Sequence, residues 1–242
     1  MRDHTSLSGA HVLITASGTG IGRGITRAFL ESGSAVTIAA RRTDVLEETA
    51  EEFRRDIPGC DVRVATCDVT QSAQVEQAVA VACSPQGHLD VAVANAGIGI
   101  PGPFLLLGDD EWRYCCEVNI IGTAATFRHA ARSMRDNGGS LIAISTAASH
   151  APEVCMAPYS ATKAAVDMMV RSAAFELAPH KIRVNAVQPG FVPTETTADI
   201  FPTELANELV ARTPLGRSGY PDDIRGLCAF ARAPRVRGSP AR

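Results

Sequence analysis

Short apolar runs alternate with longer helical patterns along most of this chain, and that alternation limits the folds open to it. Runs that are apolar on both faces and joined by helical crossovers form parallel sheets covered by helices on each side. Ligands bind such sheets at the carboxyl ends of the strands. The sequence therefore predicts an α/β fold, a doubly wound, Rossmann-like parallel sheet flanked by helices. The six predicted strands cover residues 11–15, 35–39, 62–66, 91–94, 141–144 and 182–187.

One large domain accounts for the length of the chain. Its 242 residues, of which 45% are apolar and 20% charged, can bury a full core, so no second domain is required. The composition changes only after Phe230, where arginines and two prolines interrupt any apolar pattern. We expect residues 1–231 to form a single domain and residues 232–242 an irregular basic tail.

Charge and cysteine content argue against several classes of protein. The net charge of -3 and the pI near 6.1 provide no basic field, so nucleic acid and anionic membranes are not expected partners. The seven cysteines form an odd set without a Cys-x-x-Cys pair, which argues against a disulfide framework and a structural metal. Residues 1–8 are polar, and no apolar run reaches the roughly 18 residues of a membrane span. We therefore place the protein in the cytoplasm.

The first predicted strand leads into a glycine-rich loop and then a helical pattern over residues 23–32. Glycines let the backbone turn tightly and approach a phosphate, and a helix N-terminus offers free N–H groups and a partial positive charge. A glycine-rich turn without a ligand is the alternative, but the position after the first strand favours a nucleotide. The candidate loop residues are Thr15, Ser17, Gly18, Thr19, Gly20, Ile21 and Gly22.

Tyr159 and Lys163 are four residues apart in an apolar-periodic segment, so they share one face of the predicted helix. The lysine ammonium can then lie beside the phenol, favour the phenolate and lower the pKa of Tyr159 from its usual value of about 10. Such a pair makes the tyrosine a proton donor. The structural alternative is an amphipathic helix with a snorkelling lysine, because this spacing also arises by chance.

The glycine loop and residues 159–163 resemble motifs of the short-chain dehydrogenase/reductase family. Residues 15–22 are similar to the family's Thr-Gly-x-x-x-Gly-x-Gly, with Ala16 in place of the first glycine. If that position needs a positive φ, the alanine costs about 1 kcal/mol and cofactor affinity falls. The resemblance covers about residues 10–225 and implies one Rossmann-like domain that both binds a nicotinamide dinucleotide and carries the catalytic residues.

The end of the second predicted strand bears on which nicotinamide cofactor is used. A residue that reads the ribose 2′-hydroxyl would be acidic here, but the chain has Ala40, Arg41 and Arg42. Ala40 leaves room for a 2′-phosphate, and Arg41 offers a planar fork of donors to hold it, so the sequence favours NADP(H) over NAD(H). Alternatively, both arginines simply begin the helix expected near Thr43.

Further segments resemble the family in the expected order, and the resemblance assigns each a role. Asp68 and Val69 follow the third strand, where the family's aspartate receives the adenine amino group; a helix cap before Thr70 is the alternative for Asp68. Asn119 would perturb the long helix of residues 109–136 and hold a water that links the lysine to solvent. A segment after the fourth strand would flank the adenosine ribose, with Asn95, Ala96 and Gly97. A segment after the sixth strand would contact the nicotinamide amide, with Pro189, Gly190, Val192 and Thr194.

One departure from the family pattern touches the chemistry. The family serine lies thirteen residues before the tyrosine, and that position is Thr146, with Ser145 as its neighbour. Thr146 keeps the hydroxyl that can bond a substrate carbonyl. Because adjacent residues on a strand point to opposite faces, only one of the two is expected to face the pocket. We favour Thr146, and a slipped or bulged strand would give the role to Ser145.

The resemblance implies reversible hydride transfer between NADP(H) and the carbonyl or secondary alcohol of a small molecule. Tyr159 would give the proton, Thr146 would orient the oxygen, and Lys163 would lower the tyrosine pKa and bind the nicotinamide ribose. The alternative is a cofactor-binding scaffold or regulator that is catalytically weak or inactive. Residues expected near the pocket are mostly apolar, which suits a medium-sized apolar substrate. They are Ile98, Ile100, His150, Val154, Met156, Phe191, Ile200, Phe201 and Leu205.

The resemblance also bears on assembly and on the end of the sheet. Relatives pair two long helices across two-fold axes, here residues 109–136 and 157–178, so we expect a homodimer or homotetramer. The family continues beyond residue 217 to a seventh strand, whereas the last residues here cannot form a buried apolar one. We therefore expect the usual seventh strand to be lacking and residues 182–187 to form an edge of the sheet.

Overall fold

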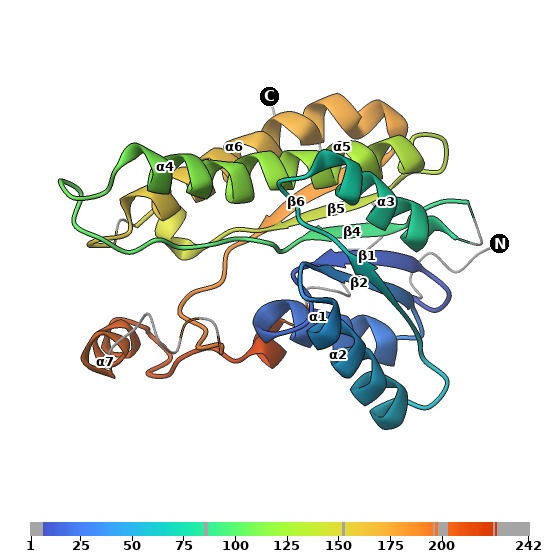
Figure 1. Ribbon diagram of the computed structural model, residues 1–242, viewed down its shortest axis with the longest axis horizontal. Helices are drawn as coiled ribbons and strands as arrows, with labels where there is room; N and C mark the ends of the chain where they lie inside the picture. Colours follow the sequence, from blue (N-terminus) through green and yellow to red (C-terminus); the bar gives the residue numbers. More distant parts are fainter. Residues whose placement is uncertain are drawn as a thin grey trace.

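The computed structural model describes residues 7–84, 87–151, 153–195, 197, 203–224 and 226. At its centre lies a six-stranded, all-parallel sheet in the order β3-β2-β1-β4-β5-β6 (Figure 1). All six predicted strands are present, three of them one or two residues longer than expected. They are β1 (His11–Thr15), β2 (Ala35–Ala40), β3 (Asp61–Thr66), β4 (Val91–Ala94), β5 (Gly139–Ile144) and β6 (Ile182–Val187).

Helices cover both faces of the sheet, so the predicted doubly wound α/β architecture is confirmed (Figure 1). One face carries α1 (Gly20–Glu31) and α2 (Thr43–Asp56). The other carries α3 (Ser72–Cys83), α5 (Gly122–Met134) and α6 (Ala157–Leu177). The first helix begins at Gly20 rather than at the expected residue 23, because the last part of the glycine loop is already its first turn.

The remaining helical segments lie around the ends of the strands. α4 (Asp109–Cys116) continues into α5 through a π-helical segment, η1 (Glu117–Ile121). α7 (Thr203–Ala211) stands apart from both helical layers, below α4 in Figure 1. Three short 3₁₀ segments complete the described elements: η2 (Ala147–Ser149), η3 (Ala178–His180) and η4 (Pro221–Ile224).

Two hydrophobic cores hold the helices to the sheet, and adjacent residues of one strand belong to different cores. Leu13 of β1 packs with α3, α5 and α6, whereas Ile14 packs with α1 and α2. Phe29 and Phe53 are fully buried in the second core, where each contributes about 1.5–3 kcal/mol of burial energy. This two-sided packing explains why the strands read as continuous apolar runs, and it fixes the loops that follow them.

The chain order reverses between β1 and β4, which are neighbours in the sheet. The connections that leave these two strands go to opposite faces, and such a switch point opens a crevice at the carboxyl ends of the strands. Within the described residues, β6 pairs with β5 alone and forms one edge of the six-stranded sheet. The predicted tail of residues 232–242 lies outside the described residues.

Candidate active site

A central cavity of about 490 Å³ lies at the carboxyl ends of β1, β4, β5 and β6. It brings together most of the predicted site residues from five separate segments of the chain. Those that line it are Thr19, Gly20, Ile21, Gly22, Asn95, Gly97, Thr146, Tyr159, Lys163, Pro189, Gly190, Val192 and Thr194. The predicted residues outside its lining are Thr15, Ser17, Gly18, Arg41, Asp68, Val69, Ala96 and Asn119.

The glycine loop wraps closely around the start of α1. A Cβ on Gly22 would lie 2.4 Å from the carbonyl oxygen of Ala16, so only glycine fits at that position. Ser17 is fully buried, donates to the carbonyl of Ile14 and accepts from the N–H of Ala39, so its side chain holds the loop together. No described side chain caps the first turn of α1, which leaves its N–H groups available to a phosphate.

Ala16 adopts the left-handed conformation with a φ of 51°, the condition under which the sequence predicted a cost. Alanine in this region loses about 1–2 kcal/mol relative to its right-handed conformation. The conformation is held from outside, because the side-chain amide of Asn95 donates to the carbonyls of both Thr15 and Ala16. The loop thus carries a strained residue at the position where the family pattern has glycine.

The segment after β4 is tied to the segment after β1, which keeps the two sides of the crevice in register. The hydroxyl of Thr15 accepts from the backbone N–H groups of both Asn95 and Ala96. Gly97 approaches the catalytic helix so closely that a Cβ there would lie 3.0 Å from Nζ of Lys163. These contacts explain the Asn-Ala-Gly sequence by backbone hydrogen bonding and by space.

Tyr159 and Lys163 lie on α6, one turn apart as predicted, and Pro158 stands in the first turn of that helix. Lys163 is buried, and its Nζ donates to the carbonyl of Ile144 at 2.7 Å. Burial lowers the pKa of Lys163 to about 8, although nearby Cys115 and Asp167 favour its charged form. The ammonium lies 5.8 Å from the centre of the Tyr159 ring.

The expected lowering of the tyrosine pKa is wrong for this structure. Burial raises the pKa of Tyr159 above its ordinary value, and Glu153 adds to that effect, while a hydrogen bond with Thr146 opposes it. The physical reason is that burial in the cavity wall disfavours the phenolate more than the surroundings stabilise it. Lys163 is itself desolvated and bonded to Ile144, so it does not outweigh that effect.

The two candidate hydroxyls after β5 make different contacts. Thr146 hydrogen-bonds the side chain of Tyr159, and its oxygen also accepts from the N–H of Ala148 at 3.3 Å. Ser145 is buried and donates to the carbonyl of Lys163 at 3.4 Å. Both residues reach the cavity wall, but it is the threonine hydroxyl that contacts the tyrosine.

Asn119 lies in the π-helical turn η1, within the long helical stretch where its interior position suggested a perturbed helix. It is fully buried. Its side chain accepts from the N–H of Ile98 at 2.8 Å and donates to the carbonyl of Ile98 and to Thr162, each at 2.9 Å. Asn119 therefore fastens the segment after β4 to α6 directly behind the tyrosine and lysine.

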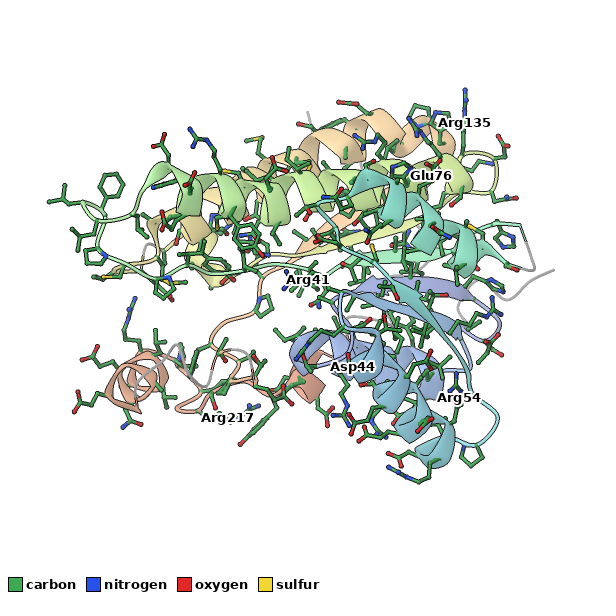
Figure 2. The ribbon with its side chains drawn as sticks, viewed as in Figure 1. Arg41, Asp44, Arg54, Glu76, Arg135 and Arg217 are labelled. Carbon is green, nitrogen blue, oxygen red and sulfur yellow. The ribbon has the colours of Figure 1, made fainter. Side chains whose placement is uncertain are left out.

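Arg41 and Asp68 lie beyond the cavity, near the end of the sheet that carries β2 and β3. Arg41 is exposed and donates to the hydroxyl of Tyr114 at 3.2 Å; Figure 2 shows it beside the strand ends. Asp68 accepts from both the N–H and the hydroxyl of Thr70, but α3 begins at Ser72 with Gln71 as its N-cap, so these bonds shape the turn before the helix and Asp68 does not cap it. Val69 is buried against Gly122, whose Cβ would lie 2.7 Å from the valine.

The expected substrate pocket is only partly formed by the predicted residues. Ile98, Met156 and Phe191 line the cavity, whereas Ile100, His150 and Val154 do not. The prediction that these three residues line the pocket is wrong. The exposed ring of His150 instead hydrogen-bonds the side chain of Gln188 at 2.8 Å and lies 3.6 Å from the carboxylate of Asp167. Ile200, Phe201 and the side chain of Leu205 lie outside the described residues.

Sequence reasoning missed several residues that line the cavity, and four of them bear on its charge and on its far wall. These are Glu153, in the segment before α6, and Leu209, Arg212 and Thr213, at the end of α7. The spacing of the last three, at positions i, i+3 and i+4, indicates one helix face. Whether that face points into the cavity depends on how α7 is placed relative to the sheet, and a local sequence pattern does not specify this.

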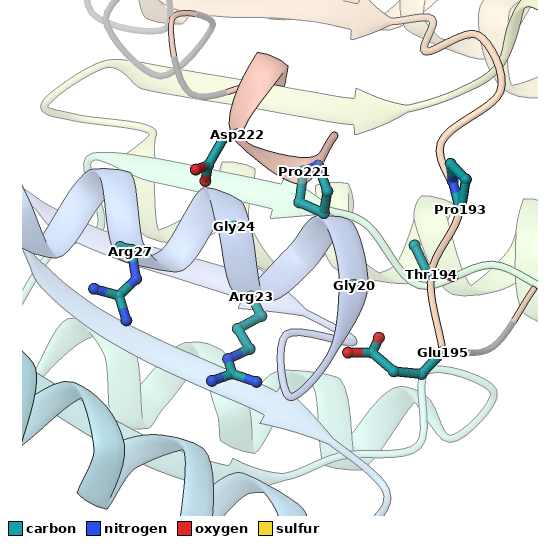
Figure 3. Close-up of a pocket in the computed structure, with 9 residues that line it drawn as sticks. All are labelled: Gly20, Arg23, Gly24, Arg27, Pro193, Thr194, Glu195, Pro221 and Asp222. Carbon is teal, nitrogen blue, oxygen red and sulfur yellow. The ribbon is translucent and has the colours of Figure 1, made fainter. Parts of the chain in front are cut away.

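A second hollow of about 510 Å³ lies on the other side of the α1 N-terminus, between α1 and η4 (Figure 3). Arg23 and Arg27 project from the same side of α1 there. Both are engaged in ion pairs with α2, Arg23 with Glu52 and Arg27 with Asp56, the latter at 2.8 Å. Because these two cations already have carboxylate partners on α2, we assign no ligand to this hollow.

Two features of the described part of the chain bear on other kinds of function. No group of three or more histidine, cysteine, aspartate or glutamate side chains there could hold a metal ion. None of the described helices is long and apolar enough to cross a membrane.

Comparison with known proteins points to one family. A family model described as enoyl-(acyl carrier protein) reductase matches residues 15–238. The 7α-hydroxysteroid dehydrogenase of Escherichia coli K12 is 30% identical over 233 residues, which are 96% of this chain and 90% of that protein.

Solved structures agree in fold and in coverage. The gluconate 5-dehydrogenase of Burkholderia cenocepacia J2315, in complex with NADP and tartrate, has a TM-score of 0.87 and 32% identity, with 95% of this chain and 90% of that chain covered. The 3-ketoacyl-(acyl-carrier-protein) reductase of Brucella melitensis, complexed with NADH, has a TM-score of 0.86 and 30% identity, covering 95% and 93%.

Proposed function

Since the chain belongs to the short-chain dehydrogenase/reductase family, whose members are hydride-transferring oxidoreductases, we propose that it uses NADP(H) to interconvert a carbonyl and a secondary alcohol. The proposed substrate is a medium-sized small molecule with a mostly apolar body. The observation that carries the proposal is the convergence of Thr146, Tyr159 and Lys163 on one wall of the central cavity.

Each of the three side chains has a task that its surroundings support. Tyr159 keeps its proton because burial raises its pKa, so it is a donor to a substrate oxygen rather than a phenolate. Thr146 bonds the tyrosine and can donate to the same substrate oxygen. Lys163, held by the carbonyl of Ile144, supplies a nearby positive charge that stabilises the phenolate formed once the proton has left.

The residues around the crevice fit a dinucleotide. The tight approaches at Gly22 and Gly97, together with the uncapped start of α1, form a cradle that side chains would fill. A nicotinamide bound there supplies or accepts the hydride. We assign its pyrophosphate to the loop of residues 15–22, its ribose and amide to Lys163 and the segment of residues 189–194, and its adenosine to Asp68, Val69 and residues 95–97.

The choice of NADP(H) over NAD(H) rests on Arg41. Similar structures contain either NADP or NADH, so the fold alone does not select the cofactor. Arg41 is exposed at the end of β2, next to the small Ala40, and its guanidinium bonds only a neutral hydroxyl among the described residues. It is therefore free to exchange that bond for a charge-assisted one to a 2′-phosphate.

A second candidate is a protein of the same fold that binds the cofactor but turns over weakly or not at all. The left-handed Ala16 favours it, because strain in the glycine loop reduces the free energy available for cofactor binding. The threonine in place of the family serine is a further departure. Against it, a purely structural role gives no reason to bury an ammonium beside a tyrosine.

We also propose that the protein is a homodimer or homotetramer built on its long helices. Ile121 of η1 and Met168 and Phe175 of α6 are 50%, 57% and 86% exposed, so these helices present apolar side chains that a second copy could cover. Light scattering at micromolar concentration would detect the assembly, and a stable monomer would exclude it.

The decisive experiment measures the reduction of a panel of ketones with NADPH and with NADH. The loss of absorbance of the reduced nicotinamide reports the rate. Tyr159→Phe should then lower kcat by about 10²- to 10⁴-fold, because it removes the transferable proton, while NADPH binding stays nearly intact. Tyr220→Phe, which alters an exposed tyrosine outside the cavity, is the matched control. Retention of more than about a tenth of the rate by Tyr159→Phe would contradict the assigned role.

A further inference from the structure

One cation in the central cavity has no task in hydride transfer. Of the described residues that line the cavity, three carry charge: Glu153, Lys163 and Arg212. Lys163 is buried and bonded to a backbone carbonyl. Arg212 is exposed, and none of the described residues forms an ion pair or a side-chain hydrogen bond with its guanidinium. Arg212 is therefore the cavity cation available to a ligand.

Arg212 reaches the cavity from a different element than the catalytic residues do. Its N–H bonds the carbonyl of Glu208, so it extends the last turn of α7, and it shares the cavity-facing side with Leu209 and Thr213. Tyr159 enters the cavity from α6. A molecule that contacts both residues must therefore span from α6 to α7.

The charged residues of the cavity determine how a ligand is oriented between α6 and α7. Glu153 acts on Tyr159 electrostatically, and the buried Lys163 places the opposite charge beside the same ring, so the charges at the tyrosine end offset each other. Arg212 has no such counter-charge among the described residues that line the cavity, so an anionic group is attracted to the α7 side. Other lining residues are apolar: Ile98, Met156, Phe191 and Leu209.

We propose that the substrate carries a carboxylate at the end remote from its carbonyl, and that Arg212 binds this carboxylate and determines specificity. The proposal rests on the proposed oxidoreductase function and narrows its substrate class to medium-sized oxo acids and the corresponding hydroxy acids. The guanidinium suits the task, because its planar fork donates two parallel hydrogen bonds to a carboxylate.

The test uses the whole protein and a panel of ketones in matched pairs, each an oxo acid and its methyl ester, with simple neutral ketones added. The wild type should reduce the acids with a kcat/KM about tenfold above that of the esters. Arg212→Gln should abolish this preference by raising KM for the acids, with little change in kcat or in the KM for NADPH. Arg135→Gln removes the same charge at the opposite side of the view from α7 (Figure 2) and should keep the preference.

A purely structural role for Arg212, as a cation near the C-terminus of α7, gives a different result. It would change the melting temperature and leave the ratio of acid to ester unchanged. Arg212→Lys keeps the charge and should retain part of the preference, which protects the test if Arg212→Gln folds poorly.

Three outcomes would overturn the proposal. Equal reduction of acids and esters by the wild type would do so while leaving the oxidoreductase function standing. A rise in the KM for NADPH alone in Arg212→Gln would assign the arginine to the cofactor instead. Failure to reduce any panel member with either cofactor would remove the proposed function, and this inference with it.

Discussion

Nζ of Lys163 donates to the carbonyl oxygen of Ile144 at 2.7 Å, and this bond joins the catalytic helix to the last residue of β5. The carbonyl partly replaces the water that a buried ammonium has lost. The bond also fixes Lys163 next to Ser145 and Thr146, which follow β5 directly. Strand and helix thus hold the lysine, the threonine and the tyrosine in one arrangement before any ligand binds.

The buried lysine makes stability depend on pH. The folded pKa of Lys163 is about 8, below its ordinary value of 10.5, so between these values the unfolded chain binds more protons. The free energy of unfolding should therefore gain a contribution from this group as pH rises from 8 to 10.5, and lose it as pH falls back through 8.

Denaturant unfolding of the wild type and of Lys163→Met between pH 7.5 and 10 measures that contribution, with the range set by the lysine pKa. The slope of stability against pH should be smaller in Lys163→Met. Tyr159 titrates at higher pH, because burial raises its pKa, so it does not distort this window. Parallel curves for the two proteins would show that Lys163 is not desolvated as the structure indicates.

The two hydroxyls after β5 should respond differently to removal. Thr146→Ala deletes the hydroxyl that bonds Tyr159 and should lower kcat by about tenfold or more. Ser145→Ala deletes a bond to the carbonyl of Lys163 and should mainly reduce stability, by about 1 kcal/mol. Steady-state kinetics and thermal unfolding of both variants separate the effects. The opposite order in kcat would give the catalytic role to Ser145.

Arg41→Asp should shift the cofactor preference from NADPH towards NADH. The change removes a charge-assisted hydrogen bond to the 2′-phosphate, worth about 1.5–3 kcal/mol, and so lowers NADPH affinity by roughly ten- to a hundredfold. Arg42→Asp is the matched control, because Arg42 precedes α2 as its N-cap residue and should matter less. The ratio of kcat/KM for the two cofactors is the measurement, and equal use of both by the wild type would contradict the assignment.

The sheet was predictable because β1, β2, β4 and β5 are buried on both faces, so that local apolar runs indicate the strands. The positions of Tyr159 and Lys163 on one side of α6 could also be predicted, because the spacing of four residues is a local signal. The pKa of Tyr159 did not follow, since it depends on burial by residues distant in sequence. Arg212 was missed because only the placement of α7 turns it towards the cavity. Local pattern predicts elements, whereas cavity walls arise from their assembly.

Ala16→Gly should stabilise the protein. The φ of 51° at Ala16 costs alanine about 1–2 kcal/mol, whereas glycine adopts it freely. Glycine also raises the entropy of the unfolded chain, which lowers stability by about 0.4–1 kcal/mol. The expected net gain in the free energy of unfolding is therefore about 0.5–1 kcal/mol. Denaturant unfolding measures the gain, and the KM for NADPH should fall if relief of strain also helps the loop to bind phosphate.

Ala161→Gly provides the matched control for that experiment, because it makes the same substitution at an exposed position inside α6. There the backbone is helical, so glycine should destabilise the protein by about 1 kcal/mol. Opposite signs for the two variants would tie the effect to the left-handed conformation of Ala16. If both variants lost stability, alanine would not be strained at position 16, where Asn95 bonds the backbone carbonyl. Strain at Ala16 could then not explain a reduced cofactor affinity.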